Sequence, residues 1–172
     1  SPDTLSRAAA FVLETSREAA AVKNTDADAR EKLKSLFMAR FDYELMGRYA
    51  MGGYWQKASA AQQSEYRALF AAYVPAGYAD QLAAYHDAGI AVIRSQTVQD
   101  GDTMITTRVM PKTGEETDIH WRVRTGQAGH KVIDVVVDGV SYLTMLREQF
   151  TAFAARNGID GLLDLLRKQT VA

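Results

Sequence analysis

Residues 132–143, VIDVVVDGVSYL, decide the fold of this 172-residue chain. β-Branched residues dominate the first half of the stretch and favour a buried strand. Asp138-Gly139 is typical of a tight turn, and Ser141 stands where the N-cap of a helix is expected. The stretch therefore predicts a strand that turns straight into a helix. Such a joint can present a nucleophile or hold a phosphate group.

The residues of this joint favour a structural role. Gly139-x-Ser141 lacks the second glycine of the G-x-S-x-G nucleophile motif, and no pattern of a parallel, doubly wound sheet surrounds it. A serine just before a helix more often caps it, and a glycine relieves a tight turn. We therefore predict that Ser141 is a cap.

Other candidate chemistry is sparse. His86, His120 and His130 have no second ligand at metal spacing. Asp134 and Asp138 fall on one face of the strand, but an acid–base pair also needs a shared pocket and opposed pKa shifts. The chain has no cysteine, and no glycine-rich phosphate loop follows a strand. We predict no catalytic residue, no metal site and no cofactor.

The composition describes an ordinary globular chain of one domain, with 47% hydrophobic and 24% charged residues. Its 20 basic and 21 acidic residues are interspersed, so no basic stripe indicates nucleic acid or an anionic membrane as a partner. No apolar run approaches the about 18 residues that a membrane helix needs. The chain opens with SPDTLS and no methionine, from which we expect a removed signal segment and secretion.

Residues 4–88 show the apolar period of helices. Ser59 and Gln62 form a capping box, in which each side chain can bind the other residue's backbone N–H. Pro75 and Gly77 interrupt the helix that follows and are expected to break or kink it. Two interpretations of this interruption stay open: a hinge, or a static kink that follows a curved sheet.

Between residues 90 and 138 the apolar period changes to two, which predicts four antiparallel strands joined by short loops. Two helices, over 141–156 and 160–170, close the chain on either side of Asn157-Gly158. The fold class is therefore α+β: a single domain, residues 1–172, with about six helices on a curved four-stranded antiparallel sheet.

The turns fix the expected strand register. A two-residue turn at Asp100-Gly101 would place Val92 opposite Val109 and Arg94 opposite Thr107. Arg94 would then point to the same face as Val109.

The turn of the last hairpin likewise fixes the expected pairing of its two strands. If Trp121 and Val135 share the inward face, the loop around residues 127–130 must hold an odd number of residues. Val123 is then expected opposite Ile133, and Ile119 opposite Val137.

Aromatic residues gather in the helical half. Seven of the eight tyrosines lie between Tyr43 and Tyr85, together with Trp55 and Met46. Tyrosine and methionine suit a cavity for a flexible apolar guest. They equally suit a packed helical core with hydroxyls at its rim, and the pattern by itself favours that core.

Three stretches resemble the toluene-tolerance/MlaC family, the periplasmic lipid carriers of Gram-negative bacteria: FDYELMGRYAMGGYWQKASAAQQSEYRALFAAYV (41–74), WRVRTGQAGHKVIDVVVDGVSYLTMLREQF (121–150) and GIDGLLDLL (158–166). The resemblance spans nearly the whole chain. Its most specific residues are Asp134, Asp138-Gly139-Val140-Ser141, Arg147 and Phe150. The matched residues look architectural, with Asp134 and Arg147 pinning the joint. The doubled Gly52-Gly53 departs from the sequence pattern of the family.

The resemblance implies a periplasmic protein, its signal peptide removed, that encloses phospholipid acyl chains in an apolar cavity between sheet and helices. Its implied partners are an outer-membrane lipoprotein complex and the MCE-domain protein of an inner-membrane ABC transporter, contacted transiently by a monomer. Family members associated with hopanoid biosynthesis share this sequence pattern, so a hopanoid is an alternative ligand. Two other classes stay open: an enzyme such as an isomerase or dehydratase in a cone-shaped α+β fold, and a non-catalytic adaptor with a filled core.

We predict a lipid pocket with a sheet wall and a helical wall. Its residues are Tyr49, Trp55, Tyr73, Tyr85, Val92, Ile105, Val109, Ile119, Trp121, Ile133, Val135, Val137, Leu146 and Phe150. An arginine on the inward face of a strand is costly unless an anion meets it. Arg94 is therefore a candidate contact for a lipid phosphate, the alternative being an arginine that reaches solvent from the strand edge.

Overall fold

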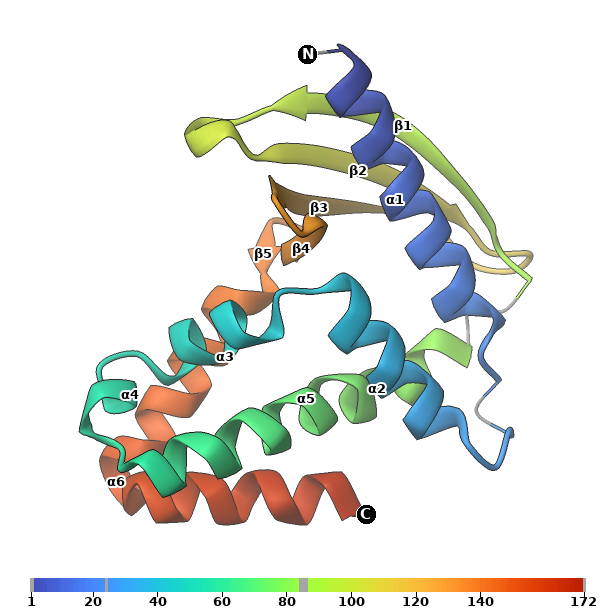
Figure 1. The fold of residues 1–172 in the computed structure, drawn as a ribbon. Coiled ribbons are helices and arrows are strands. Elements are labelled where there is room, and N and C mark those ends of the chain that lie inside the picture. The colour runs from blue at the N-terminus through green and yellow to red at the C-terminus, as the bar shows by residue number, and fades with distance from the viewer. Residues whose placement is uncertain (1, 24, 84–86, 172) are drawn as a thin grey trace.

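The computed structural model describes residues 2–23, 25–83 and 87–171 (Figure 1). The helices are α1 (Pro2–Ala21), α2 (Ala29–Arg40), α3 (Tyr43–Met51), α4 (Tyr54–Lys57), α5 (Ala60–Ala83) and α6 (Tyr142–Val171). The strands are β1 (Gly89–Thr97), β2 (Thr103–Met110), β3 (Thr117–Gly126), β4 (Gly129–Val137) and β5 (Val140–Ser141), with a short 3₁₀ turn, η1 (Gln99–Gly101), between β1 and β2. The predicted α+β class and six helices are confirmed.

The sheet is open and antiparallel, with the order β1-β2-β3-β4-β5, so each strand lies beside its neighbour in sequence. It has five strands, and the expectation of four was wrong. The difference arises at Asp138 and Gly139, whose φ angles of 53° and 76° are both in the left-handed region. Two such residues make a tight hairpin turn. Val140 is thereby returned to pair with Val137 before the helix begins.

A bulge sets the register of β3 and β4. Trp121 pairs with Val135 and Ile119 with Val137, as predicted, but Val123 pairs with Val132 and not with Ile133. The hairpin loop holds two residues between Gly126 and Gly129, so the predicted odd number was wrong. Ile133 is the extra residue that the bulge leaves without a partner. Because the loop has an even number of residues, this one extra residue is what lets Trp121 and Val135 both face inward.

A second bulge lies in β1. Val92 pairs with Thr107 and Arg94 with Thr106, while Ile93 has no partner. The predicted pairs were wrong by one residue for Arg94 and by two for Val92. The three-residue turn η1 and the bulge together account for the shift. Because side chains alternate along a strand, a shift of one residue moves Arg94 to the opposite face of the sheet.

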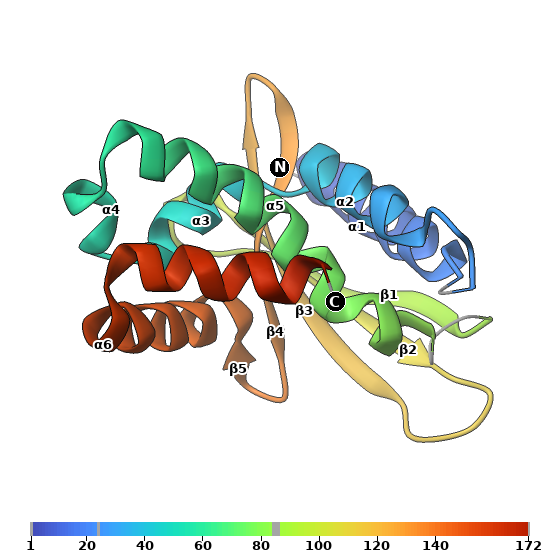
Figure 2. The same ribbon diagram turned by 90° about the horizontal axis from the view of Figure 1, so that it is seen from below.

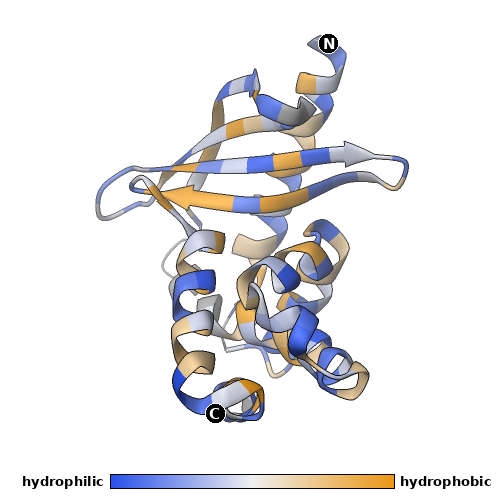
Figure 3. Ribbon diagram, turned by 90° about the vertical axis from the view of Figure 1, so that its left-hand side faces the viewer, coloured by the Kyte–Doolittle hydropathy of each residue, from blue (hydrophilic) through white to orange (hydrophobic). Residues whose placement is uncertain are grey.

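The helices form two groups around the sheet (Figure 1). Helix α1 crosses one face of β1 and β2, where Ala8 and Val12 pack with Ile105 and Val123. The other helices pack mostly on one another around Met51, Phe70 and further fully buried side chains. Figure 3 shows hydrophobic and hydrophilic residues alternating along the strands, as expected for strands with one buried face.

Several local predictions are confirmed at the helix ends. The Ser59 Oγ accepts from the backbone N–H of Gln62 at 3.1 Å, and the Gln62 Oε1 accepts from that of Ser59 at 2.8 Å. Ser141 caps α6 by accepting from the N–H of Thr144 at 3.1 Å. The expected separation of the last two helices lies at Gly158, a non-helical residue where α6 changes direction (Figure 2).

Pro75 does not end its helix, because α5 continues from Ala60 to Ala83 across it. Proline has no N–H, so the carbonyl one turn earlier loses its helical hydrogen bond.

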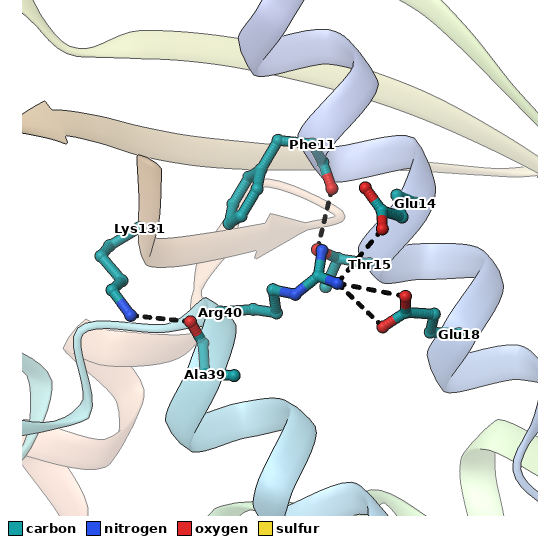
Figure 4. Close-up of polar contacts among 7 residues, drawn as sticks. All are labelled: Phe11, Glu14, Thr15, Glu18, Ala39, Arg40 and Lys131. Atoms are coloured by element: carbon teal, nitrogen blue, oxygen red, sulfur yellow. Dashed lines mark hydrogen bonds and ion pairs between the residues drawn. The ribbon is translucent and has the colours of Figure 1, made fainter. Parts of the chain in front are cut away.

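Arg40, the last residue of α2, ties α1 to the rest of the molecule (Figure 4). Its Nη2 lies 3.1 Å from Glu18 and 3.3 Å from Glu14, and its Nη1 donates to the Thr15 hydroxyl at 3.3 Å. The guanidinium also lies over the Phe11 ring, 5.5 Å from its centre. These contacts hold the middle of α1 against α2.

Candidate functional site

A cavity of about 440 Å³ lies between the inner face of the sheet and the helices. Every helix except α4, and every strand, contributes to its wall. The lining residues are Thr15, Ser16, Ala19, Ala20, Leu33, Leu36, Phe37, Phe41, Met46, Val74, Pro75, Ile90, Val109, Thr117, Ile119, Trp121, Val135, Val137, Val140, Tyr142 and Met145. Native cores are close-packed and rarely leave voids larger than a water molecule, whereas ligand pockets commonly measure about 300–1,000 Å³. The size is that of a binding site.

No charged side chain is among these lining residues. Three of their polar groups form hydrogen bonds within the protein. The hydroxyls of Thr15 and Ser16 donate to the carbonyls one turn earlier in α1, at 2.8 and 2.9 Å. The indole N–H of Trp121 donates to the Thr107 hydroxyl at 3.0 Å. The cavity therefore presents an apolar surface suited to hydrocarbon.

Val140 marks a rim of this cavity. It lines the cavity, yet 56% of its surface is exposed. The short strand β5, which the sequence did not reveal, places this apolar side chain at the sheet edge beside the start of α6. The cavity therefore has an exposed apolar side chain at this rim.

Five of the residues predicted for the pocket line the cavity: Val109, Ile119, Trp121, Val135 and Val137. All five come from the central strands, where apolar alternation is a direct guide to the inner face. Their contact with lipid stays a prediction.

The other described residues of the prediction do not line this cavity. Leu146 and Phe150 are fully buried in the helical core, and Tyr73 packs against Phe150 with ring centres 5.5 Å apart. Val92 and Ile105 pack under α1, and Ile133 is the buried extra residue of the β4 bulge.

Two further predicted aromatics, Tyr49 and Trp55, do not line the cavity either. Tyr49 is 42% exposed, with the Arg147 guanidinium 4.5 Å from its ring centre. Trp55 packs at the core margin with Arg67 over its ring, 5.0 Å from the centre. Tyr85 lies outside the described residues. Among the described tyrosines, Tyr66 is buried in the helical core, and Tyr43, Tyr54 and Tyr73 pack against it.

Arg94 is exposed on the outer face of the sheet. It pairs there with Thr106, which in turn lies opposite His120. A hydrogen bond from Arg108 lowers the pKa of Asp118, and the charge of Arg94 acts in the same direction. Arg94 therefore belongs to a polar outer surface, and its predicted place on the inner face was wrong, while a contact with lipid phosphate stays a prediction.

Sequence reasoning missed most of the helical wall. Thr15, Ser16, Ala19 and Ala20 form one face of α1, four small residues at helical spacing. Small side chains on the inner face of a helix leave space between helix and sheet, and this was the signal in the sequence.

The joint after β4 carries no catalytic geometry. The Asp134 carboxylate accepts from the Ser141 hydroxyl at 2.5 Å and from the backbone N–H groups of Val135 and Leu143 at 2.8 and 3.0 Å. It is fully occupied in holding the turn to the helix, while Asp138 is exposed in the turn itself. Arg147 does not touch the joint; it donates to the Tyr49 carbonyl at 3.4 Å.

The contacts of His120 and His130 also indicate a structural role. The Nδ1 atoms of His120 and His130 lie 2.8 and 2.7 Å from the hydroxyls of Thr106 and Thr125. His86 lies outside the described residues. Within the described part of the chain, no group of three or more histidine or acidic side chains could hold a metal ion.

One buried charge network lies away from the cavity, where η1 meets β3. Asp102 is 1% exposed and accepts from Arg122 at 2.7 Å and from Arg124 at 2.9 Å. Burial acts to raise the pKa of Asp102, but the hydrogen bonds and charges of Arg124 and Arg122 outweigh it and hold that pKa below its ordinary value. The network fastens the β1–β2 turn to β3.

Across residues 2–23, 25–83 and 87–171, no helix combines the length and apolar character needed to span a membrane.

Comparison with known proteins gives two findings. The family model described as MlaC protein matches residues 7–168. A solved structure of a phospholipid-binding protein from Ralstonia solanacearum, in complex with a phospholipid, is similar in fold, with a TM-score of 0.79. The two sequences are 24% identical, and the match covers 95% of this chain and 96% of that one.

Proposed function

This chain belongs to the MlaC family, and we propose that it binds a phospholipid by enclosing the acyl chains in the cavity between sheet and helices. One observation carries the proposal: a cavity of about 440 Å³ whose described lining has no charged side chain. Each buried CH₂ group of an acyl chain contributes about 0.8 kcal/mol, so a cavity of this kind favours long hydrocarbon over small polar metabolites.

The solved protein of the same fold supports this ligand class, since it was determined with a phospholipid bound. An enzyme is disfavoured by the site itself. The lining described here offers no carboxylate and no histidine to act as acid or base.

We further propose that the protein carries lipid through the periplasm, as the family resemblance implies. It would exchange lipid with an outer-membrane lipoprotein complex and with the MCE-domain protein of an inner-membrane ABC transporter. A carrier must release its cargo, and the exposed rim at Val140 offers an apolar exit for the chains.

Lipid extraction tests the ligand class. The protein is purified without detergent, weighed by native mass spectrometry, and then extracted with organic solvent for lipid identification. We expect a co-purified phospholipid. A hopanoid would keep the carrier role and change the ligand class, whereas protein that purifies empty and takes up no lipid from vesicles would refute the proposal.

A further inference from the structure

A second, smaller cavity adjoins the first. Its volume is about 270 Å³, and its described lining residues all come from α5 and α6. Tyr142 and Met145 line both cavities, so these two side chains stand between them. On α5, Pro75 lines the first cavity and Gly77 the second. The two spaces are therefore neighbours on both helices.

The walls of the two cavities differ in polarity. Those of the second include Tyr73, Gln149 and Gln169, and no charged side chain is among its described lining residues. Gln149 and Gln169 are exposed, so this cavity opens to water, and neither amide has a hydrogen-bond partner among the described residues.

Tyr73 adds a half-buried hydroxyl that is likewise without a partner in the described part of the chain. Burial raises the pKa of this hydroxyl, so it stays protonated and can donate at neutral pH. A tyrosine hydroxyl and two primary amides provide both donors and acceptors, which suits ester and phosphate oxygens.

We propose that the second cavity binds the polar part of the lipid, its glycerol esters and phosphate, through Tyr73, Gln149 and Gln169. The arrangement matches the polarity of an amphiphile, with hydrocarbon in the uncharged inner cavity and oxygen atoms in the water-facing one. This inference rests on the proposed function and adds a headgroup site to it.

Tyr73, Gln149 and Gln169 are all uncharged groups, and this has a consequence for selectivity. A neutral donor binds a phosphate oxygen, but it has no net charge that would attract additional negative charge elsewhere in the headgroup. Binding through these three groups should therefore accept zwitterionic and anionic phospholipids with similar affinity.

The test compares a ligand with a headgroup and one without. Lipid-stripped protein is equilibrated with phosphatidylcholine vesicles or with hexadecane, re-isolated, and its bound molecule quantified over a concentration series to give Kd. The variant is Gln149→Leu/Gln169→Leu. Both residues are exposed, so folding should not suffer. The control is Gln56→Leu, the same change at an exposed glutamine that lines neither cavity.

We expect the double variant to bind phosphatidylcholine about tenfold more weakly, as the loss of two neutral hydrogen bonds implies, and hexadecane within twofold of wild type. The control should match wild type for both ligands. Unchanged phosphatidylcholine affinity, or an equal loss for both ligands, would overturn the headgroup site and leave the proposed function standing. Wild-type protein that binds neither ligand would overturn both. Phosphatidylglycerol bound more than tenfold tighter than phosphatidylcholine would overturn the neutral-donor account.

Discussion

Trp121 and Val135 face each other across β3 and β4, and both side chains line the cavity. Their neighbours in register, Ile119 and Val137, continue the same wall. Trp121 is held in place by its hydrogen bond to Thr107. This pair of strands therefore forms a fixed apolar wall, opposite which the small residues of α1 leave room for a guest.

The cap of α5 should contribute to stability and not to binding. Ser59→Ala removes one half of the observed capping box, and we expect the free energy of unfolding to fall by about 1 kcal/mol. Chemical denaturation measures the change. Ser64→Ala, an exposed serine farther along the same helix, serves as control and should cost little. Equal behaviour of the two variants would contradict the role of Ser59.

The joint between sheet and α6 depends on Asp134. Asp134→Asn replaces an oxygen acceptor with an NH₂ group in a site where three donors converge. We expect a loss of about 1–3 kcal/mol in unfolding free energy, measured by urea denaturation. Asp138→Asn provides the comparison, because asparagine tolerates the left-handed backbone at that position. A smaller loss at 134 than at 138 would refute this account of the joint.

The Asp102 network predicts a pH dependence. The pKa of Asp102 in the folded protein lies below its ordinary value, so the ionised carboxylate stabilises the fold above about pH 4, and this contribution is lost as pH falls through the folded-state pKa. Asp102→Asn should lower the urea midpoint at pH 7, and the gap to wild type should narrow at acid pH. A gap that stays constant down to pH 2 would argue against the charge network.

Arg40 should determine how firmly α1 covers the cavity. Arg40→Met keeps the apolar stem but removes the contacts with Glu14, Glu18 and Phe11 (Figure 4). We expect the α1 backbone amides to exchange with deuterium roughly two- to fivefold faster, with little change in α5. Arg17→Met, at an exposed position on α1, is the control. Unaltered exchange in the Arg40 variant would show that packing alone holds the helix.

The sequence predicted the elements well, because their signals are local. Capping residues such as Ser59 and Ser141, and the apolar alternation of β3 and β4, act within a few residues of where they stand. Register was predicted less well. Bulges at Ile93 and Ile133 insert one residue each, and nothing in the local pattern marks them.

The helical wall of the cavity was harder to predict, since it depends on how distant elements pack. Phe150 and Trp55 have the size and character of pocket residues but pack in the helical core or against it. Ser16 and Ala19, which look unremarkable in sequence, line the cavity because α1 crosses the sheet. Small side chains leave volume unfilled between helix and sheet. The small residues on the buried face of α1 therefore indicated the cavity better than the large aromatic residues did.

Val135 lines the cavity, and we propose that lipid occupies the space that it faces. Val135→Trp should therefore place an indole in the cavity, with near-native stability in the lipid-free protein and clearly less co-purified lipid. Val132→Trp is the matched control on the same strand. Val132 is fully buried and does not line the cavity, so overpacking there should cost about 1–3 kcal/mol.

The decisive measurement is the thermal unfolding of both variants and wild type, each with and without bound phospholipid. A ligand raises the melting temperature only in proportion to its binding, so the lipid-dependent rise should shrink in Val135→Trp while its lipid-free melting temperature stays near that of wild type. A lipid-free Val135→Trp protein that melts several degrees lower, as Val132→Trp should, would place residue 135 in packed core and contradict the cavity.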